Sequence, residues 1–183
     1  MITLDQFTKL FPKAVRMPDT YQALVDEMIV GKIDNNLRQS YFLAQLAHES
    51  AGFHYIKELG GPSYFKKMYD ISGNRPSVAR RLGNIHAGDG ARFPGRGWIQ
   101  LTGRHNYTLY SQLLGLDLVG NPELAGNPEV AAKVACKYWV DHACNALSDS
   151  SDFVAVTKKI NGGTNGLPDR RRWLAKIQHI IGT

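Results

Sequence analysis

Residues 36–58 read NLRQSYFLAQLAHESAGFHYIKE, and this stretch predicts the centre of the fold. Its apolar side chains recur at helical spacing over a broad face: Leu37, Tyr41, Phe42, Leu43, Ala44, Leu46 and Ala47. A helix that is apolar almost all the way round is a buried one. The small pair Ala51 and Gly52 predicts where the helix ends. We therefore expect a central buried helix and, with it, a mainly α fold.

Two carboxylates lie at the end of this stretch, Glu49 at the expected helix end and Glu58 nine positions later. The C-terminal end of a helix carries partial negative charge, and burial disfavours a charged carboxyl, so both effects favour a protonated acid at the first position. Glu58 stands beside Lys57 in a more polar context, which favours a carboxylate. Two carboxyls in contrasting environments suit glycosidic hydrolysis, where one donates a proton and the other handles water. The plainer alternative is that Glu49 caps the helix or forms a salt bridge.

Helical periodicity continues through most of the chain. Thr3 and Gln6 form a capping-box pattern at the first helix. We expect further helices over residues 18–30, 104–115, 128–145, 151–160 and 167–181. The segment 59–103 is rich in glycine and turn residues, so we expect it to be irregular, with one possible short strand at RGWIQL, residues 96–101. The prediction is a single mainly α catalytic domain, residues 1–183, with a loop-built cleft, at most a small β element and no separate wall-binding domain.

Composition limits the class of protein. The 183 residues include 22 basic and 16 acidic side chains, a net charge of +6, and 43% hydrophobic residues. This charge suits an anionic partner, whether nucleic acid, cell wall or lipopolysaccharide, but it also suits a plain solvated surface. No apolar run reaches the length of about eighteen residues that predicts a membrane-spanning helix. The first residues lack the basic and then apolar pattern of a signal peptide, so we expect synthesis in a cytoplasm.

Other chemistries find little support in the sequence. His48 and Glu49 begin a zinc-protease-like pattern, but the next histidine, His54, is six positions after His48 and would face another side of a helix. No GxSxG, phosphate-binding loop or paired CxxC motif occurs. We therefore expect neither a metal nor a cofactor. Cys136 and Cys144 would lie about 12 Å apart along one helix, too far for a disulfide, so two buried free thiols are expected.

Two later segments carry polar side chains that suit a sugar. In GRGWIQLTGRHNY, residues 95–107, Gln100 and Thr102 would point to the same side of an extended segment, where an amide and a hydroxyl can bind sugar hydroxyls or hold a water. In INGGTNGLPDRRRW, residues 160–173, Asn161 stands at an expected helix end and Arg170 near the start of the last helix. Each alone is more typical of a turn or a structural hydrogen bond. Their joint presence favours a saccharide site.

Three segments, FLAQLAHESAGFHYIKE (42–58), GDGARFPGRGWIQLTGRHNY (88–107) and INGGTNGLPDRRRW (160–173), together resemble glycoside hydrolase family nineteen, the chitinase and phage-endolysin family with a lysozyme-like α fold. Their order and spacing match over residues 36–180. The resemblance implies an inverting mechanism with Glu49 as general acid, Glu58 as base, and Thr102, where chitinases usually have serine, as holder of the water. It also implies a substrate-binding set: His48, Arg96, Gln100, Tyr107, Asn161 and Arg170. In this set Arg170 pairs with the acidic site, and His48 and Arg96 act as supports.

The segments ELGGPSYFKKMYD (58–70) and ARRLGN (79–84) look like the endolysin and phage-tail bacteriocin branch, and the long loops and disulfides of plant-type chitinases are absent. This likeness implies a monomeric muramidase that cleaves the β-1,4 bond between N-acetylmuramic acid and N-acetylglucosamine in peptidoglycan, with no nucleic-acid partner and no membrane insertion. It also implies that the protein waits in the host cytoplasm until a holin releases it to the periplasm and cell wall. The alternatives are a chitinase that cleaves β-1,4 N-acetylglucosamine polymers and a non-catalytic sugar-binding or DNA-associated module.

Overall fold

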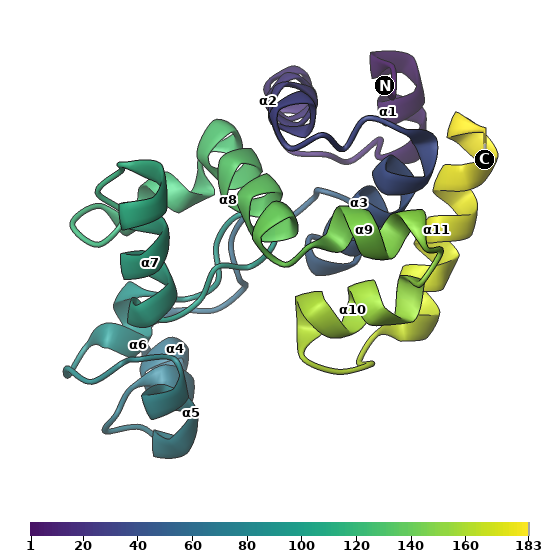
Figure 1. The fold of residues 1–183 in the computed structure, drawn as a ribbon. Helices are drawn as coiled ribbons and strands as arrows, with labels where there is room; N and C mark the ends of the chain where they lie inside the picture. The colour runs from purple at the N-terminus through teal and green to yellow at the C-terminus, as the bar shows by residue number, and fades with distance from the viewer. Residues whose placement is uncertain (183) are drawn as a thin grey trace. The chain divides into compact units, whose positions relative to one another are not determined.

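Helices account for nearly all the regular structure in the computed structural model, which describes residues 1–182 (Figure 1). The chain forms two compact units. The terminal unit comprises residues 1–55 and the chain from Ala135 onward, and the inserted unit comprises Ile56–Val134. The predicted mainly α fold with at most a small β element is confirmed.

The terminal unit is built around one buried helix. Its helices are α1 (Leu4–Leu10), α2 (Met17–Val30), α3 (Asn36–Glu49), the C-terminal part of α8 (Pro128–Asp141), α9 (Cys144–Asp149), α10 (Phe153–Asn161) and α11 (Leu167–Ile181). α3 lies at the centre, since all its residues from 39 to 47 are buried, and it packs against α9, α10 and α11. Phe42 meets Trp139 with ring centroids 5.2 Å apart, and Tyr41 meets Phe153 at 4.9 Å. The predicted central helix is confirmed.

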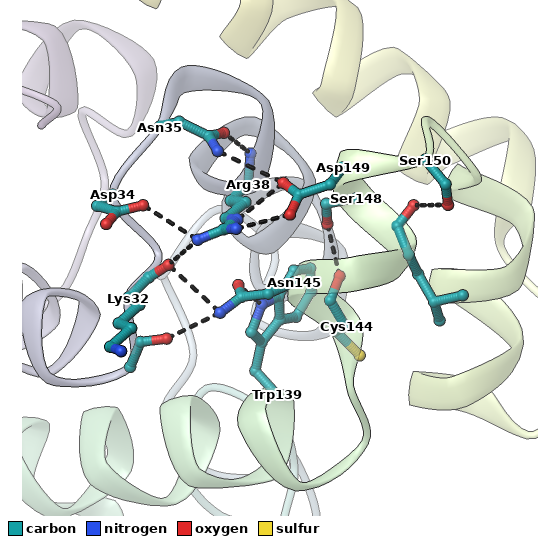
Figure 2. A network of polar contacts seen from close by, with 12 residues as sticks. Lys32, Asp34, Asn35, Arg38, Trp139, Cys144, Asn145, Ser148, Asp149 and Ser150 are labelled. Carbon is teal, nitrogen blue, oxygen red and sulfur yellow. Dashed lines mark hydrogen bonds and ion pairs between the residues drawn. The ribbon is translucent and has the colours of Figure 1, made fainter.

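A polar network fastens the N-terminal end of α3 to α9 (Figure 2). Arg38 donates to both carboxylate oxygens of Asp149, at 2.8 and 2.6 Å, and to the carbonyl oxygen of Lys32 at 2.8 Å. Asn145 accepts a hydrogen bond from the indole nitrogen of Trp139 at 2.8 Å and donates to the same Lys32 carbonyl at 3.3 Å. The entry of the central helix is therefore set by side chains that lie 111 positions apart in the sequence.

The other end of α3 is held by a tight turn and an aromatic cluster. The Ser50 hydroxyl accepts a hydrogen bond from the backbone N–H of Phe53 at 2.8 Å. Phe53 packs on Phe11 at 4.8 Å between centroids, and Phe11 packs on Trp173 at 5.6 Å. Gly52 has a φ of +72°, and a Cβ built there would lie 3.1 Å from the Trp173 ring. The turn after α3 therefore needs a left-handed backbone conformation close to the Trp173 ring, and only glycine adopts it at this position without strain.

The inserted unit holds α4 (Pro62–Tyr69), α5 (Pro76–Arg81), α6 (Asp89–Arg92), α7 (Arg104–Leu114), the 3-10 helix η1 (Pro122–Gly126) and the start of α8. The expectation that residues 59–103 would be irregular is therefore wrong where α4, α5 and α6 lie. These helices have 8, 6 and 4 residues, too few turns for hydrophobic periodicity to be recognisable.

Two buried aspartates hold the short helices of the inserted unit in place. Asp70 accepts hydrogen bonds from the hydroxyl of Ser72 at 2.8 Å and from the backbone N–H of Gly88 at 2.6 Å. Asp89 accepts from Nε and Nη2 of Arg104 at 2.9 and 2.6 Å. Burial on its own would raise the pKa of Asp89, but the hydrogen bonds from Arg104 and from the backbone N–H of His86, together with the charge of Arg104, outweigh burial and lower this pKa. Tertiary contacts thus stabilise helices that the local sequence does not predict.

Two further local expectations differ from the observed backbone. RGWIQL forms a tight turn rather than an extended strand: Arg96 and Leu101 exchange backbone hydrogen bonds at 3.1 and 2.8 Å, and Gln100 has a φ of +56°. Arg96 also forms an isolated bridge with Lys57. The helix expected over residues 128–145 is interrupted between α8 and α9, where Ala143 has a φ of +55°.

The two cysteines are buried free thiols, as predicted. Burial raises the pKa of the Cys144 thiol to about 12 and raises the pKa of the Cys136 thiol well above its ordinary value. Of the helices formed by residues 1–182, none is both long and apolar enough to cross a bilayer.

Candidate active site

Glu58 is held by three hydrogen bonds within the inserted unit. Its backbone N–H donates to the carbonyl of Gly95 at 2.9 Å, and the Gly95 N–H donates to Oε2 of Glu58 at 3.0 Å. The hydroxyl of Tyr69, the last residue of α4, donates to Oε1 at 2.7 Å. Burial first, and then the contact with Glu58, raise the pKa of Tyr69 well above its usual value, so the phenol keeps its proton. Each carboxylate oxygen of Glu58 therefore has a fixed donor.

Three oxygen atoms converge on the space beside Gly95. A Cβ built on this glycine would lie 2.5 Å from Oε1 of Gln100, 3.2 Å from Oγ1 of Thr102 and 3.3 Å from Oε2 of Glu58. The Thr102 hydroxyl donates to the backbone carbonyl of Gln100 at 2.7 Å, and Gln100 Nε2 donates to the carbonyl of Gly97 at 3.1 Å. The amide oxygen of Gln100 is thereby turned toward this space. The absence of a side chain at Gly95 lets these three oxygens approach one another, since a Cβ there would collide with the amide oxygen of Gln100.

Arg96 and Tyr107 support this site from inside the unit and offer no surface to a sugar. Tyr107 has no exposed surface, and its hydroxyl accepts from Nη1 of Arg96 at 2.8 Å and donates to the carbonyl of Pro94 at 3.0 Å. Burial raises the pKa of Tyr107 to about 12. Nη2 of Arg96 donates to Glu123 at 2.6 Å, and Lys57 pairs with Glu123 at 3.2 Å. The expected sugar contact of Tyr107 is wrong, because this side chain is buried and its hydroxyl is taken up by Arg96 and Pro94.

Glu49 ends α3 in the terminal unit, and its side chain is 23% exposed. Its Oε1 pairs with Nη2 of Arg170, whose side chain has no exposed surface. Nη1 of Arg170 donates to Oε1 of Gln45 at 2.7 Å, and Gln45 in turn donates to the hydroxyl of Thr157 at 3.1 Å. Glu49 is thus only partly buried, and it meets the guanidinium of Arg170, the residue that the family resemblance pairs with the acidic site.

His48 and Asn161 hold the loop between α10 and α11. Nδ1 of His48 lies 2.6 Å from Oδ2 of Asp169, and a Cβ built on Gly166 would overlap the other edge of the imidazole at Nε2. Burial alone would raise the pKa of Asp169, whereas its hydrogen bond with His48 lowers this pKa, and the net shift is downward. Nδ2 of Asn161 donates to the carbonyl of Asn165 at 3.0 Å. The loop that precedes α11 is therefore shaped by side chains that the sequence assigned to the substrate.

The zinc-like pattern does not form a cluster. His54 is exposed, with Nδ1 lying 3.1 Å from the carbonyl oxygen of Lys13, whereas His48 contacts Asp169. Within the described part of the chain, residues 1–182, no three His, Cys, Asp or Glu side chains are grouped so that they could hold a metal ion.

Comparison with known proteins identifies the family to which these residues belong. Residues 25–174 match the glycoside hydrolase family 19 description, Chitinase class I. A protein of Haemophilus influenzae named as a glycosyl hydrolase family 19 domain-containing protein is 36% identical over 93% of this chain and 92% of its own length. The chain belongs to glycoside hydrolase family 19. It is therefore a glycoside hydrolase.

Solved structures agree with this assignment. Chitinase C from Streptomyces griseus HUT6037 is similar to this family 19 hydrolase with a TM-score of 0.78 and 27% identity, over 100% of this chain and 77% of that one. A bacterial family 19 chitinase shares the fold, with a TM-score of 0.76 at 22% identity. Chitinase 6 of rice is 32% identical over 72% of this chain, and the matched part is 45% of the rice protein. The chain thus matches less than half the length of this plant relative.

Several supporting residues of this family 19 hydrolase are missing from the sequence-based prediction: Gln45, Tyr69, Gly95 and Glu123. Gln45 has a local signal, because it precedes Glu49 by one helical turn on the same face. The others have none. Tyr69 contacts a residue 11 positions away and Glu123 contacts one 27 positions away, across turns whose geometry the sequence does not specify.

Proposed function

We propose that this family 19 hydrolase is a peptidoglycan-degrading endolysin, a muramidase that cleaves the β-1,4 bond between N-acetylmuramic acid and N-acetylglucosamine. The observation that carries the hydrolytic part of the proposal is the convergence of Glu58 Oε2, Thr102 Oγ1 and Gln100 Oε1 on the space beside Gly95. A water molecule placed there would meet one carboxylate, one hydroxyl and one amide oxygen. The carboxylate could take up one proton of this water as it attacks, and one of the other two oxygens could accept the second hydrogen bond.

In the proposed reaction, Glu49 protonates the glycosidic oxygen as it leaves, and Glu58 removes a proton from the attacking water. Thr102 holds that water, and Gln100 accepts a hydrogen bond from the water or from a sugar hydroxyl. Water attacks the face of the sugar opposite the leaving group, so the anomeric configuration inverts. Tyr69 and Gly95 keep the carboxylate of Glu58 in one orientation, which lowers the cost of reaching the reactive geometry. Arg170 positions Glu49 and balances the negative charge that Glu49 carries once it has given up its proton.

The preference for peptidoglycan over chitin is supported by charge. The chain carries a net charge of +6, and peptidoglycan carries carboxylates on its stem peptides, whereas chitin is neutral. Opposite charges raise the rate at which enzyme and substrate meet. We propose that the protein acts as a monomer in the periplasm, after accumulating in the host cytoplasm and passing through a holin-opened membrane.

Mass spectrometry of the reduced products tests the substrate and the bond together. Purified peptidoglycan treated with the enzyme should release muropeptides that end in reduced N-acetylmuramic acid. Proton NMR during the first turnovers should show the α-anomer, because a β-linked bond is cleaved with inversion. Efficient cleavage of chitin oligosaccharides without muropeptide release would instead establish the chitinase alternative, which the similarity to chitinases favours.

Replacement of the general acid separates a hydrolase from a non-catalytic module. Glu49→Gln should reduce the turnover rate at least ~100-fold while the protein still binds insoluble peptidoglycan. Full lytic activity in this variant would contradict the role proposed for Glu49.

A further inference from the structure

One segment of the inserted unit exposes several charged side chains, all of the same sign. We call residues 62–81, which comprise α4, α5 and the turn between them, the cationic segment. Its five basic residues are all exposed: Lys66, Lys67, Arg75, Arg80 and Arg81. Its single acidic residue, Asp70, is buried. The charged side chains exposed on the segment are therefore all positive.

Neither Asp70 nor any other described carboxylate neutralises this surface. The carboxylate of Asp70 is taken up by Ser72 and by the backbone N–H groups of Gly88 and Gly90. Of the ion pairs formed by residues 1–182, none involves a basic residue of the cationic segment. Other cations of the chain, such as Arg104 with Asp89, do have carboxylate partners. The charge of the cationic segment is therefore available to an external anion.

The basic side chains sit on a closely packed support. α4 and α5 are in contact, and the N–H of Asn74 donates to the carbonyl of Lys67 at 2.9 Å, which folds the turn back onto α4. Gly73 packs directly against the carbonyl of Lys66, so a Cβ there would overlap backbone atoms. Arg75 directly follows this turn, just after the end of α4 in the chain. Lys66, Lys67 and Arg75 are presented together.

The same support carries the proposed base. α4 begins the cationic segment and ends at Tyr69, whose hydroxyl donates to Glu58 Oε1 at 2.7 Å. A polymer held by the cationic segment would consequently be held on the element that orients the catalytic carboxylate.

We propose that the cationic segment docks the carboxylates of the peptidoglycan stem peptides, so that this enzyme selects an acidic glycan over a neutral one. This proposal rests on the proposed muramidase function. Guanidinium and ammonium groups bind carboxylates, and the guanidinium does so with two parallel hydrogen bonds. Each exposed contact is weak on its own, but a polymer that repeats its carboxylates engages several at once, and the contacts then reinforce one another. A neutral chitin chain gains none of them.

The test compares two variants of equal charge. In the first, Lys66, Lys67, Arg80 and Arg81 are all replaced by Gln. In the control, four exposed basic residues elsewhere are replaced by Gln: Lys9, Lys13, Lys133 and Arg171. Sedimentation with purified sacculi measures binding, and the initial rate of muropeptide release measures kcat/KM. Thermal unfolding followed by circular dichroism checks that both variants are folded.

Four lost contacts should weaken binding to sacculi and lower kcat/KM by about tenfold or more in the first variant, with the control near wild type. The difference should be largest near 0.01 M salt and shrink near 0.15 M, because the screening length falls from about 30 to about 8 Å. Cleavage of neutral chitin oligosaccharides, where measurable, should be equal in all three proteins. Amidation of the stem-peptide carboxylates should lower wild-type binding to the level of the first variant.

Equal losses in the two variants would overturn the proposal, since they would show that only net charge matters. Unchanged binding to amidated sacculi would also overturn it. Binding of double-stranded DNA as tightly as sacculi, with the same loss in the first variant, would mean that the segment docks nucleic acid instead. A wild-type enzyme that binds sacculi through this segment but releases no muropeptides would refute the muramidase function and leave the docking itself standing.

Discussion

The hydroxyl of Tyr69 donates a hydrogen bond to Oε1 of Glu58 at a distance of 2.7 Å, although Tyr69 lies in α4 and Glu58 lies before this helix. This bond joins the end of α4 to the carboxylate that we assign as the base. Together with the N–H of Gly95, which donates to Oε2, it fixes the orientation of that carboxylate.

Removal of the phenolic hydroxyl should slow the chemical step. Tyr69→Phe should lower kcat by about 10-fold to 100-fold, because a hydrogen bond to a charged group contributes roughly 1.5–3 kcal/mol, and KM should change little. The pKa of Tyr69 is raised, so the wild-type hydroxyl stays protonated and the loss should persist across the neutral range. Tyr64→Phe, an exposed tyrosine on the same helix, is the matched control. An unchanged kcat and pH profile for Tyr69→Phe would show that Tyr69 does not position the base.

A side chain at Gly95 should abolish the space among the three oxygens. In Gly95→Ala the Cβ would lie 2.5 Å from Oε1 of Gln100, and this flexible amide can move away at small cost to stability. We expect a loss of activity of about 100-fold, since such displacements of site groups are costly, with thermal unfolding nearly unchanged. Gly126→Ala is the control, because nothing lies within 4 Å of its Cβ position. Wild-type activity in Gly95→Ala would mean that the space is not used by the reaction.

The ion pair between Arg170 and Glu49 should contribute to stability as well as to the site. Arg170→Met leaves Glu49 and Gln45 without their donor, and we expect a loss of about 2 kcal/mol or more in the free energy of unfolding. This loss of stability stays below that measured on breaking fully buried ion pairs, because the Glu49 side chain is partly exposed to solvent. Arg171→Met, an exposed neighbour on α11, should change it by less than about 0.5 kcal/mol. Urea unfolding measures both, and equal effects would argue against the ion pair.

Asp89 should make the protein less stable in acid. Its pKa is lower in the folded state than in the unfolded state, so the unfolded state binds more protons between the two values and stability rises with pH there. The contribution is complete above about pH 4 and is lost as pH falls through the folded pKa. Urea unfolding from about pH 6 to about pH 3 should therefore show a smaller loss for Asp89→Asn than for wild type. The exposed Asp5→Asn variant should keep the wild-type slope, and an identical slope in Asp89→Asn would contradict the argument.

Long helices and their ends could be predicted from local sequence. The capping box of Thr3 and Gln6 is present at α1, and α11 spans residues 167–181 as predicted. The buried face of α3 follows from its composition alone, because a helix with so few polar positions has to lie inside. The glycine-rich middle could not be predicted in the same way, since α4, α5 and α6 are too short to show periodicity and their surroundings include contacts of Asp70 and Asp89 with residues 15 or more positions away.

The sequence by itself determined which residues we assign to the chemistry. The acids Glu49 and Glu58 stand out at a helix end and nine residues beyond it, and the motif around Gln100 and Thr102 stands out by its polar side chains. Only the tertiary structure decided their surroundings. The partners Tyr69 and Gly95 reach the second acid through turns, and Arg170 reaches the first from another helix. The same folding withdrew Tyr107 into the interior. Helix periodicity is a local property and can be read along the chain, whereas hydrogen-bond partners are chosen by packing between segments far apart in sequence.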